Sequence, residues 1–375
     1  MRIMITGGGT AGHTSPAVAI IEELQRRDPR LMVQWIGRKG GREEKLCTRL
    51  SIPFRSVPVA PWPRSKGLRM GWAAFRVALG FARSMLYIQR FRPQAVIGVG
   101  SYVSIPLLLA AQRRGAPTFL HEQNKRLGMA NQLAAKRATA LFLSYPETLG
   151  DYPEERAIVS GNPVRAAFLK PPSQADARRR FGLQHDIPVL LVTGGSQGAQ
   201  RINEAVHGLL PELGRNECQI LWTTGTAFAA KARTLAAECP VQVQVFPYIE
   251  DMVHAMAAAD LIVSRAGASS TAEIAAIGKP SILVPYPHAT ENHQEINARA
   301  FESAEAGEVI LDADLSSERL LDSLHRLLPD PQVRERMSRA ALTLARPEAA
   351  EIIADKVLEI IFDETGTAGN EAEDQ

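Results

Sequence analysis

Short apolar runs alternate with amphipathic segments along most of the chain. In the first half, six runs indicate buried parallel strands, because their apolar residues are nearly continuous. They are RIMIT (2–6), LMVQWIG (31–37), AVIGVG (95–100), PTFLHE (117–122), ALFLS (140–144) and AIVSG (157–161). Helical spacing fills most of the gaps, as in PAVAIIEELQRR and VSIPLLLAAQRRG. This alternation predicts a doubly wound α/β sheet.

The pattern starts again after a proline pair and a charged helix, which predict a linker near residues 165–175. IPVLLVTGGSQGAQRINEAV repeats the strand, glycine turn and helix of the chain start, and QILWTTG, VQVFPYI, LIVSRAG and SILVPY continue as strands. We therefore predict two Rossmann-like domains facing across a cleft, at residues 1–165 and 166–345. A helix at 346–362 is expected to return to the first domain, and the polar residues 363–375 to be disordered.

Composition narrows the class of protein. The chain has 375 residues, 45% of them apolar and 22% charged, as in an ordinary globular protein. Its three cysteines are odd in number and lack CxxC spacing, which argues against a disulfide framework or a zinc site. Met1 leads directly into a strand and no run of 18 apolar residues occurs, so neither a signal peptide nor a membrane span is expected.

Charge is unevenly distributed. Between Glu44 and Glu122 there are twelve Lys and Arg residues and no acidic residue. Arginines recur every seven residues from Arg69 to Arg90, beside apolar residues at helical spacing. This segment is either a core-facing helix with solvated arginines or a helix that contacts an anionic membrane surface. Nucleic acid is a third possibility, but no binding module is visible and no such partner is expected.

The first glycine turn, GGGTAGHTSP, has the spacing of a dinucleotide-binding loop. Gly7, Gly9 and Gly12 fit G-x-G-x-x-G between a strand and a helix. A nicotinamide enzyme also needs a carboxylate after the second strand, where this chain has Arg38 and Lys39. An NADP oxidoreductase stays open as an alternative, since an arginine there can hold a 2′-phosphate.

His13 directly follows the last glycine of this turn. The positive end of the helix dipole disfavours an imidazolium, so a neutral ring here is suited to act as a general base. The alternative is a histidine that only caps the turn.

The second glycine turn, TGGSQGAQRIN, suits a diphosphate. Gly194, Gly195 and Gly198 permit close backbone approach at a helix N-terminus, and Ser196 adds a donor. The turn lacks the lysine of a Walker A loop, so ATP hydrolysis is not expected.

Two further segments carry polar side chains at strand ends. In SRAGASSTAEIAAIGKP, the hydroxyls of residues 269–271 either cap a helix or donate to phosphate oxygens. Glu273 either complements the helix dipole in the first turn or binds ribose hydroxyls. In PYPHATENHQEINA, Gln294 stands where a loop enters a helix.

HEQN, residues 121–124, forms a cluster that we interpret as too polar for a core. The carboxyl ends of parallel strands face the ligand crevice, so these residues are expected to line it. Metal binding by His121 and Glu122 lacks a spaced third ligand, and no metal is expected.

Eight ordered blocks together resemble one family. They are GGGTAGHTSPAVAI, GVGSYVSIPLLLAA, HEQNKRLGMANQ, GNPVR, TGGSQGAQRIN, YIEDM, SRAGASSTAEIAAIGKP and PHATENHQEINA. Over residues 2–345 the chain resembles the MurG family, the N-acetylglucosaminyltransferases of bacterial peptidoglycan synthesis. The resemblance implies a GT-B fold and inverting transfer from UDP-N-acetylglucosamine to the C4 hydroxyl of the muramoyl sugar of lipid I, giving lipid II. It also implies no cofactor, a place at the cytoplasmic face of the cell membrane, and other cell-wall synthesis proteins as candidate partners.

The resemblance assigns roles to single residues. Glu273 would bind the ribose, Gln294 the sugar hydroxyls, and the backbone of Ile249 the uracil. His13 matches the family's candidate base, and the acceptor would be contacted by His121 and Glu122. The full donor set implied is Thr10, Ala11, Gly12, Asn124, Arg165, Ser196, Ile249, Ser269, Ser270, Thr271, Glu273 and Gln294. The basic helix would then present a membrane patch made of Trp72, Phe75, Arg76, Leu79 and Arg83.

Two positions depart from the family pattern, Ala11 and Ser101, where glycine is usual. Neither departure touches His13, Glu273 or Gln294, so we interpret both as tolerated. Three alternatives remain open from the sequence: a related glycosyltransferase with another acceptor, a non-catalytic nucleotide-sugar-binding protein, and the NADP oxidoreductase.

Overall fold

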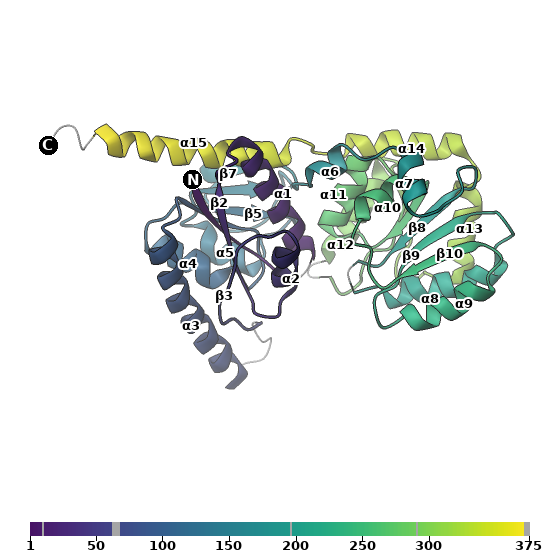
Figure 1. Ribbon diagram of the computed structural model, residues 1–375, viewed down its shortest axis with the longest axis horizontal. Coiled ribbons are helices and arrows are strands. Elements are labelled where there is room, and N and C mark those ends of the chain that lie inside the picture. Colours follow the sequence, from purple (N-terminus) through teal and green to yellow (C-terminus); the bar gives the residue numbers. More distant parts are fainter. Residues whose placement is uncertain (10, 62–67, 196, 290–291, 371–375) are drawn as a thin grey trace. The chain divides into compact units, whose positions relative to one another are not determined.

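The computed structural model describes residues 1–9, 11–61, 68–195, 197–289 and 292–370 (Figure 1). The chain divides into two compact units. The N-terminal unit comprises Met1–Ala166 and the segment from Arg346 onward, and the C-terminal unit comprises Ala167–Ala345. Thr10 and Ser196, both expected in the donor site, lie outside the described residues.

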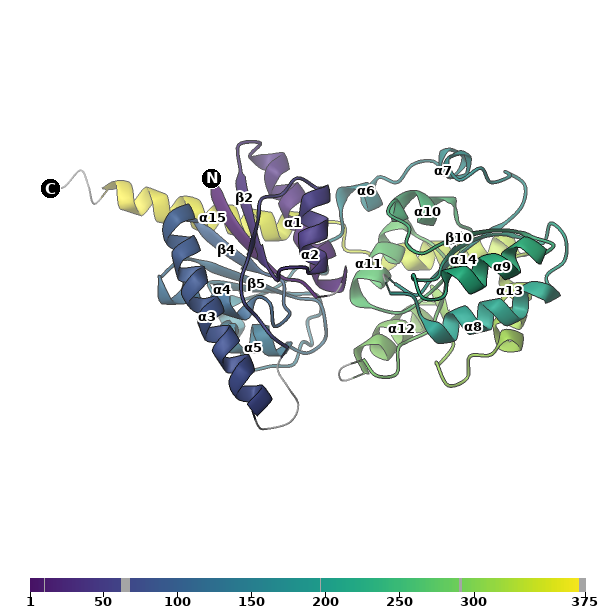
Figure 2. The same ribbon diagram turned by 60° about the horizontal axis from the view of Figure 1, so that its bottom comes forward.

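The N-terminal unit is built on a parallel sheet with the strand order β3-β2-β1-β4-β5-β6-β7. Its strands are β1 (Arg2–Thr6), β2 (Met32–Gly37), β3 (Phe54–Ser56), β4 (Ala95–Gly98), β5 (Thr118–Glu122), β6 (Ala140–Leu143) and β7 (Ala157–Val159). One face is covered by α1 (Ala11–Arg27), α2 (Arg42–Arg49) and α15 (Ala349–Asn370). The other is covered by α3 (Leu68–Phe91), α4 (Ile105–Arg113) and α5 (Met129–Ala135) (Figure 2).

Burial on both faces explains the continuous apolar strands. In β1, Ile3 and Ile5 pack toward α1 and α15, while Met4 packs toward the helices of the opposite face. Successive side chains of a strand point to opposite faces, so each must be apolar when both faces are covered.

The C-terminal unit repeats this architecture with a six-stranded parallel sheet ordered β10-β9-β8-β11-β12-β13. Its strands are β8 (Val189–Thr193), β9 (Gln219–Thr223), β10 (Gln242–Phe246), β11 (Leu261–Ser264), β12 (Ser281–Leu283) and β13 (Gly307–Val309). Its helices are α6 (Ala166–Leu169), α7 (Gln174–Arg180), α8 (Gln200–Leu209), α9 (Ala229–Glu238), α10 (Met252–Ala258), α11 (Ala268–Ile277), α12 (His293–Ser303), α13 (Ser317–Leu327) and α14 (Pro331–Thr343). Single 3₁₀ turns occur at η1 (Glu154–Arg156), in the N-terminal unit, and at η2 (Leu210–Glu212), in this one.

The prediction of two Rossmann-like α/β domains is confirmed. Each strand predicted from an apolar run is present, whereas β3 and β13, with three residues each, were not predicted. Both are edge strands, and half-buried or exposed positions replace the continuous apolar run there. A second difference concerns the chain end: α15 continues to Asn370, so residues 363–370, expected to be disordered, are helical.

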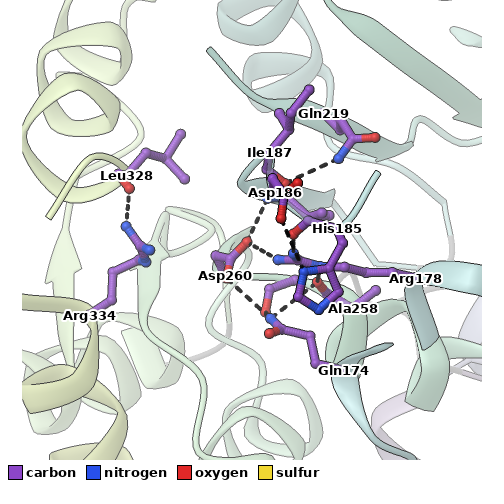
Figure 3. Close-up of polar contacts among 12 residues, drawn as sticks. Gln174, Arg178, His185, Asp186, Ile187, Gln219, Ala258, Asp260, Leu328 and Arg334 are labelled. Carbon is purple, nitrogen blue, oxygen red and sulfur yellow. Dashed lines mark hydrogen bonds and ion pairs between the residues drawn. The ribbon is translucent and has the colours of Figure 1, made fainter. Parts of the chain in front are cut away.

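A charged cluster fixes α7 to the amino-terminal edge of the second sheet (Figure 3). Asp260 accepts a hydrogen bond from the backbone N–H of Val189 at 2.7 Å and from Gln174 Nε2 at 3.1 Å, and it pairs with Arg178. Both charged side chains are largely buried, so loss of either partner would leave the other without its counter-charge. This cluster is structural, because ligands bind at the opposite, carboxyl-terminal edge of such sheets.

Candidate active site

In the N-terminal unit, the strand order reverses between β1 and β4. In open parallel sheets, ligands bind at the carboxyl ends of the strands at this switch point. Three segments end there: the first glycine turn after β1, residues 99–101 after β4, and HEQN at the end of β5. The topology therefore brings together residues far apart in sequence.

The glycines of the first turn are required by close packing. A Cβ atom at Gly7 would lie 2.2 Å from a methyl carbon of Val99, and one at Gly8 would lie 2.5 Å from the carboxyl carbon of Glu43. Gly9 has φ +83°, a conformation that favours glycine. No larger residue fits at Gly7 or Gly8 without moving a neighbouring side chain.

Glu43 packs beneath the first glycine turn and binds its backbone. Its side chain is fully buried, and its carboxylate accepts hydrogen bonds from the backbone N–H groups of Gly9, at 3.3 Å, and Arg38, at 2.8 Å. Sequence reasoning missed this residue. The available signal was an acidic pair, Glu43 and Glu44, at the start of the helix that follows the second strand.

His13 lies in the first turn of α1, with a half-buried ring. Its Nδ1 atom lies 3.1 Å from the carbonyl oxygen of Val99 and 3.1 Å from Oε1 of Gln123. Both partners are oxygens that only accept, so a neutral ring carries its proton on Nδ1. Nε2 then has the free lone pair, which is the arrangement a general base needs.

Three of the four HEQN residues are buried, contrary to the expectation that the cluster is too polar for a core, whereas Asn124 is half-buried. His121, Glu122 and Gln123 are 0%, 2% and 2% exposed. His121 Nε2 lies 3.1 Å from the carbonyl oxygen of Gly161, and burial lowers the pKa of His121 to about 4. Because these side chains are enclosed, the structure gives His121 and Glu122 internal contacts in place of the expected direct contacts with an acceptor.

Glu122 organises the loop that follows β5. One carboxylate oxygen accepts from both the backbone N–H and the side-chain amide of Asn124, each at 3.1 Å. The other accepts from the N–H of Gly128 at 2.9 Å and from Asn131 Nδ2 at 2.8 Å. These four hydrogen bonds compensate the burial of the carboxylate and fix the position of Asn124.

Arg165 is half-buried and lies near Glu22 of α1. The carboxylate of Glu22 accepts a hydrogen bond from the backbone N–H of Ala166 at 3.2 Å. Burial raises the pKa of Glu22, while this hydrogen bond and the charge of Arg165 act in the opposite direction. The linker start is thereby attached to α1.

In the C-terminal unit, two turns interlock at the carboxyl ends of β8 and β9. A Cβ atom at Gly198 would lie 2.0 Å from the carbonyl oxygen of Thr224, and one at Gly225 would lie 2.2 Å from the carbonyl oxygen of Gln197. Gly195, Gly198 and Gly225 all have positive φ. Close backbone contacts therefore hold the two turns together, and α8 begins directly after the glycine turn.

The N-terminus of α11 lies at the end of the neighbouring strand β11. Its N-cap is Gly267, where an added Cβ would meet no atom within 4 Å. The hydroxyl of Thr271 lies within hydrogen-bond distance of the carbonyls of Gly267, at 3.2 Å, and Ala268, at 3.1 Å. Ser269 and Thr271 are buried, whereas Ser270 and Glu273 are half-buried. Glu273 was expected in the first turn of α11 but lies after it. Its interpretation as a complement to the helix dipole is therefore weakened.

Gln294 and Ile249 are both anchored by their surroundings. Gln294 Oε1 accepts a hydrogen bond from the backbone N–H of Tyr286 at 3.0 Å, so its Nε2 group is oriented as a donor. Ile249 is buried in the hydrophobic core that covers one face of the sheet, which fixes the adjacent backbone.

Arg265, which sequence reasoning did not single out, supports Gln294 indirectly. It pairs with Asp312 at 2.5 Å, donates to the carbonyls of Val284 and Pro285 at 3.2 Å, and stacks over the ring of Tyr286. The arginine thus holds the end of β12 and the residue to which Gln294 is bonded. Among the residues that the structure describes, no three His, Cys, Asp or Glu side chains gather as a metal site.

The apolar residues of α3 face outward. Trp72, Phe75 and Leu79 are 57%, 52% and 44% exposed, so the core-facing interpretation is wrong for them. The buried face of the helix instead carries Ala73 and Gly80, and a Cβ atom at Gly80 would lie 2.4 Å from the carbonyl oxygen of Pro58.

Of the arginines of this helix, Arg76 is half-buried and Arg83 is exposed. Arg76 lies over the ring of Trp72, and Arg83 donates to the hydroxyl of Tyr87 at 2.8 Å. In the described part of the chain, no helix is long and apolar enough to cross a membrane.

Comparison with known proteins places both units in one family. Residues 3–143 match the glycosyltransferase family 28 N-terminal domain, and residues 189–353 match its C-terminal domain. A protein of Listeria welshimeri named UDP-N-acetylglucosamine–N-acetylmuramyl-(pentapeptide) pyrophosphoryl-undecaprenol N-acetylglucosamine transferase is 36% identical, covering 96% of this chain and 100% of the relative. Its counterpart of the same name in Bacillus subtilis is 37% identical, covering 93% and 97%.

Solved structures agree. The crystal structure of Acinetobacter baumannii MurG matches with a TM-score of 0.72 and 29% identity, covering 96% of this chain and 99% of that one. A UDP-GlcNAc 2-epimerase from Neisseria meningitidis, 16% identical with a TM-score of 0.67, shares the fold. The two Rossmann-like units thus form a GT-B fold, and the chain belongs to the MurG family of N-acetylglucosaminyltransferases within glycosyltransferase family 28.

Proposed function

We propose that this chain transfers N-acetylglucosamine from UDP-N-acetylglucosamine to the C4 hydroxyl of the muramoyl sugar of lipid I, with inversion, to form lipid II. The names of the relatives support the two substrates. The observation that carries the chemistry is the contact of His13 Nδ1 with two accepting oxygens, which leaves Nε2 as a proton acceptor at the switch point of the first sheet.

The reaction needs a base and a site for developing negative charge. As the acceptor oxygen forms its bond to the anomeric carbon, its proton passes to His13 Nε2. The bond between the anomeric carbon and the UDP oxygen breaks, and its electron pair stays on the diphosphate. The second glycine turn and the N-terminus of α11 supply backbone N–H groups and a helix dipole that stabilise this charge.

We assign the donor contacts within this scheme. Glu273 accepts from the ribose hydroxyls, Gln294 donates through Nε2 to the sugar hydroxyls, and the backbone at Ile249 contacts uracil. Backbone N–H groups are better suited to the diphosphate than the hydroxyl of Thr271, which lies against helix carbonyls. The remaining proposed donor contacts are Thr10, Ala11, Gly12, Asn124, Arg165, Ser196, Ser269 and Ser270.

The direct test is a transfer assay with labelled UDP-N-acetylglucosamine and a lipid I analogue. Labelled disaccharide lipid is expected, with UDP released in equal amount. A second reaction with a lipid diphosphate that lacks the muramoyl sugar is the control, and no product is expected from it. Release of UDP without labelled lipid, or equal transfer to the control lipid, would exclude the proposed acceptor.

The exposed patch on α3, formed by Trp72, Phe75, Leu79, Arg76 and Arg83, is proposed to bind the cytoplasmic face of the membrane. Its apolar side chains would enter the headgroup boundary, and its arginines would face anionic lipid. This places the catalytic unit beside a lipid-linked acceptor. Contacts with other cell-wall synthesis proteins remain candidates without a surface assigned to them.

A matched pair of leucines tests the patch. Leu79→Ser is expected to lower binding to vesicles containing phosphatidylglycerol several-fold, because a half-exposed leucine contributes on the order of 1 kcal/mol when buried. Leu342→Ser, at a similarly exposed position on α14, is expected to have no effect. Sedimentation with vesicles measures both. Equal binding by the two variants would contradict a membrane role for α3.

A further inference from the structure

A continuous chain of hydrogen bonds joins His13 to the interior of the N-terminal unit. His13 Nδ1 lies 3.1 Å from Gln123 Oε1, and Gln123 Nε2 lies 3.0 Å from His121 Nδ1. His121 Nε2 then lies 3.1 Å from the carbonyl oxygen of Gly161. Gln123 and His121 are buried, so bulk water does not compete for these contacts.

With both rings neutral, a single placement of protons satisfies every contact. The carbonyl of Gly161 requires a proton on His121 Nε2, and the carbonyl of Val99 requires one on His13 Nδ1. His121 Nδ1 is therefore an acceptor and takes a proton from Gln123 Nε2, whose second proton goes to Val99 O at 3.0 Å. Gln123 Oε1 is left to accept from His13 Nδ1, whose single proton it shares with the carbonyl oxygen of Val99. The flipped amide would set its oxygen against the carbonyl of Val99.

Burial keeps the protons of these hydrogen bonds in this pattern. Burial lowers the pKa of His121 to about 4, so its ring stays neutral near pH 7. The other titratable groups that contacts bring close are Glu43, which binds the N–H of Gly9, and Glu122, whose carboxylate is turned to the loop after β5. Neither makes a described hydrogen bond to the rings or to the amide.

We infer that Gln123 and His121 are positioning residues for His13: they hold its proton on Nδ1 and its ring in place, so that Nε2 is presented as the proton acceptor. This inference rests on the proposed role of His13 as the base. Neither residue touches a substrate, and both act only through the His13 ring. A buried neutral amide beside the base orients it without adding charge.

The first test replaces the amide by a side chain of similar length, Gln123→Met. We expect kcat to fall roughly tenfold to a hundredfold, with KM for UDP-N-acetylglucosamine unchanged, because loss of a supporting contact misplaces the reacting group. In ¹⁵N spectra of histidine-labelled protein, His13 should lose the fixed pattern of a protonated Nδ1 and an unprotonated Nε2. His13→Ala identifies the signals.

Gln112→Met is the matched control. Gln112 is a partly buried amide of the same unit, and its Nε2 donates to Ala134 O at 2.8 Å and Thr118 Oγ1 at 3.3 Å, in contacts that do not involve His13. Gln112→Met is expected to lower the free energy of unfolding by about as much as Gln123→Met does. It should leave kcat and the His13 signals unchanged.

A second variant, Gln123→Glu, has a readout that a purely structural role would not move. A carboxylate beside Nδ1 stabilises the imidazolium, and activity needs the neutral ring, so the acid limb of the kcat profile should shift to higher pH. This variant retains the size of glutamine. If Gln123→Met does not fold, Gln123→Glu tests whether Gln123 positions His13.

The inference is overturned if Gln123→Met keeps the wild-type His13 signals and lowers kcat no more than Gln112→Met, or if Gln123→Glu leaves the acid limb in place. If the wild-type protein transfers no sugar, the proposed function fails. The ¹⁵N spectra still show, independently of activity, whether Gln123 fixes the proton on His13.

Discussion

The two glycine turns of this protein look alike in sequence and differ in what surrounds them. The first is backed by a buried carboxylate, Glu43, and carries an imidazole, His13, at the start of its helix. The second is packed against the backbone of the neighbouring turn, with close approaches at Gly198 and Gly225. In the described part of the second turn, no titratable side chain lies between β8 and α8.

This difference indicates that the two glycine turns have different roles. A carboxylate beneath the first turn makes it a poorer site for an anion, and the same turn presents a base. The second turn offers backbone N–H donors and a helix N-terminus, and its described residues carry no charged side chain, which favours a diphosphate. We therefore propose that the N-terminal unit supplies the base and that the C-terminal unit binds the diphosphate, and each prediction below tests one of these two roles.

The largest effect is expected from His13→Ala. Loss of a positioned base lowers turnover by roughly 10²–10⁴. The affinity for UDP should change little, because the proposed ribose and uracil contacts, at Glu273 and Ile249, lie in the other unit. Steady-state kinetics and calorimetric titration with UDP separate the two quantities.

His185→Ala serves as its control, since His185 is an exposed histidine of the C-terminal unit. It should leave both turnover and UDP affinity unchanged. A His13→Ala enzyme with wild-type turnover would remove His13 as the base and end the proposed division between the turns.

The next effect concerns stability in acid. His121 has a pKa lowered from 6.5 to about 4 by burial, so between these values the unfolded chain binds the proton and the folded chain does not. The contribution of His121 to the free energy of unfolding is therefore complete above pH 6.5. It is lost as pH falls toward 4, which lowers the free energy of unfolding by on the order of 3 kcal/mol. Urea unfolding at pH 7 and pH 4.5 measures this loss.

His121→Gln removes the titration while keeping donors and an acceptor. Its stability should depend less on pH over the same range, even if it is lower at pH 7. A pH dependence identical to that of the wild type would assign the acid sensitivity to other groups. No comparable buried histidine is described at the second turn, so the effect belongs to the first site.

On the nucleotide side, Glu273→Ala is expected to weaken donor binding roughly tenfold to a hundredfold, the effect of losing hydrogen bonds to a charged group. Turnover at saturating donor should be nearly unchanged, the reverse of the His13→Ala result. Titration with UDP-N-acetylglucosamine gives the affinity.

Glu318→Ala provides the comparison for helix-dipole effects, because Glu318 lies in the first turn of α13 in the same unit. It should not alter donor affinity. If Glu273→Ala binds the donor as tightly as Glu318→Ala, the ribose contact is wrong.

The hydrophobic pattern predicted most of this fold because both sheets are covered on both faces. Continuous apolar runs such as Val189–Thr193 then have no other stable arrangement than a buried strand. The three-residue edge strands lacked that signal. The HEQN cluster was misjudged for a different reason. Polar side chains are expected to be exposed only if the interior offers them no hydrogen-bond partners.

Here the partners come from distant segments. His121 and Gln123 are compensated by carbonyls at residues 161 and 99, and Glu122 by donors in the loop and helix that follow. A single sequence does not reveal which backbone carbonyls a fold will place beside a polar side chain. Glu43 escaped notice for the same reason, since its partners, Gly9 and Arg38, lie in separate turns.

The smallest predicted effect tests whether the first site also carries backbone strain. Every described residue with positive φ in the second turn is glycine, whereas Ser101, which follows β4 beside the first turn, has φ +73°. A side chain in this conformation costs roughly 1–2 kcal/mol, and glycine offsets part of that by its greater freedom when unfolded. Ser101→Gly should therefore raise the free energy of unfolding by less than about 1 kcal/mol. Asn216→Gly, at φ +64° in the C-terminal unit, should gain less, because asparagine tolerates this region. Equal gains in urea unfolding would show that the strain is not particular to the first site.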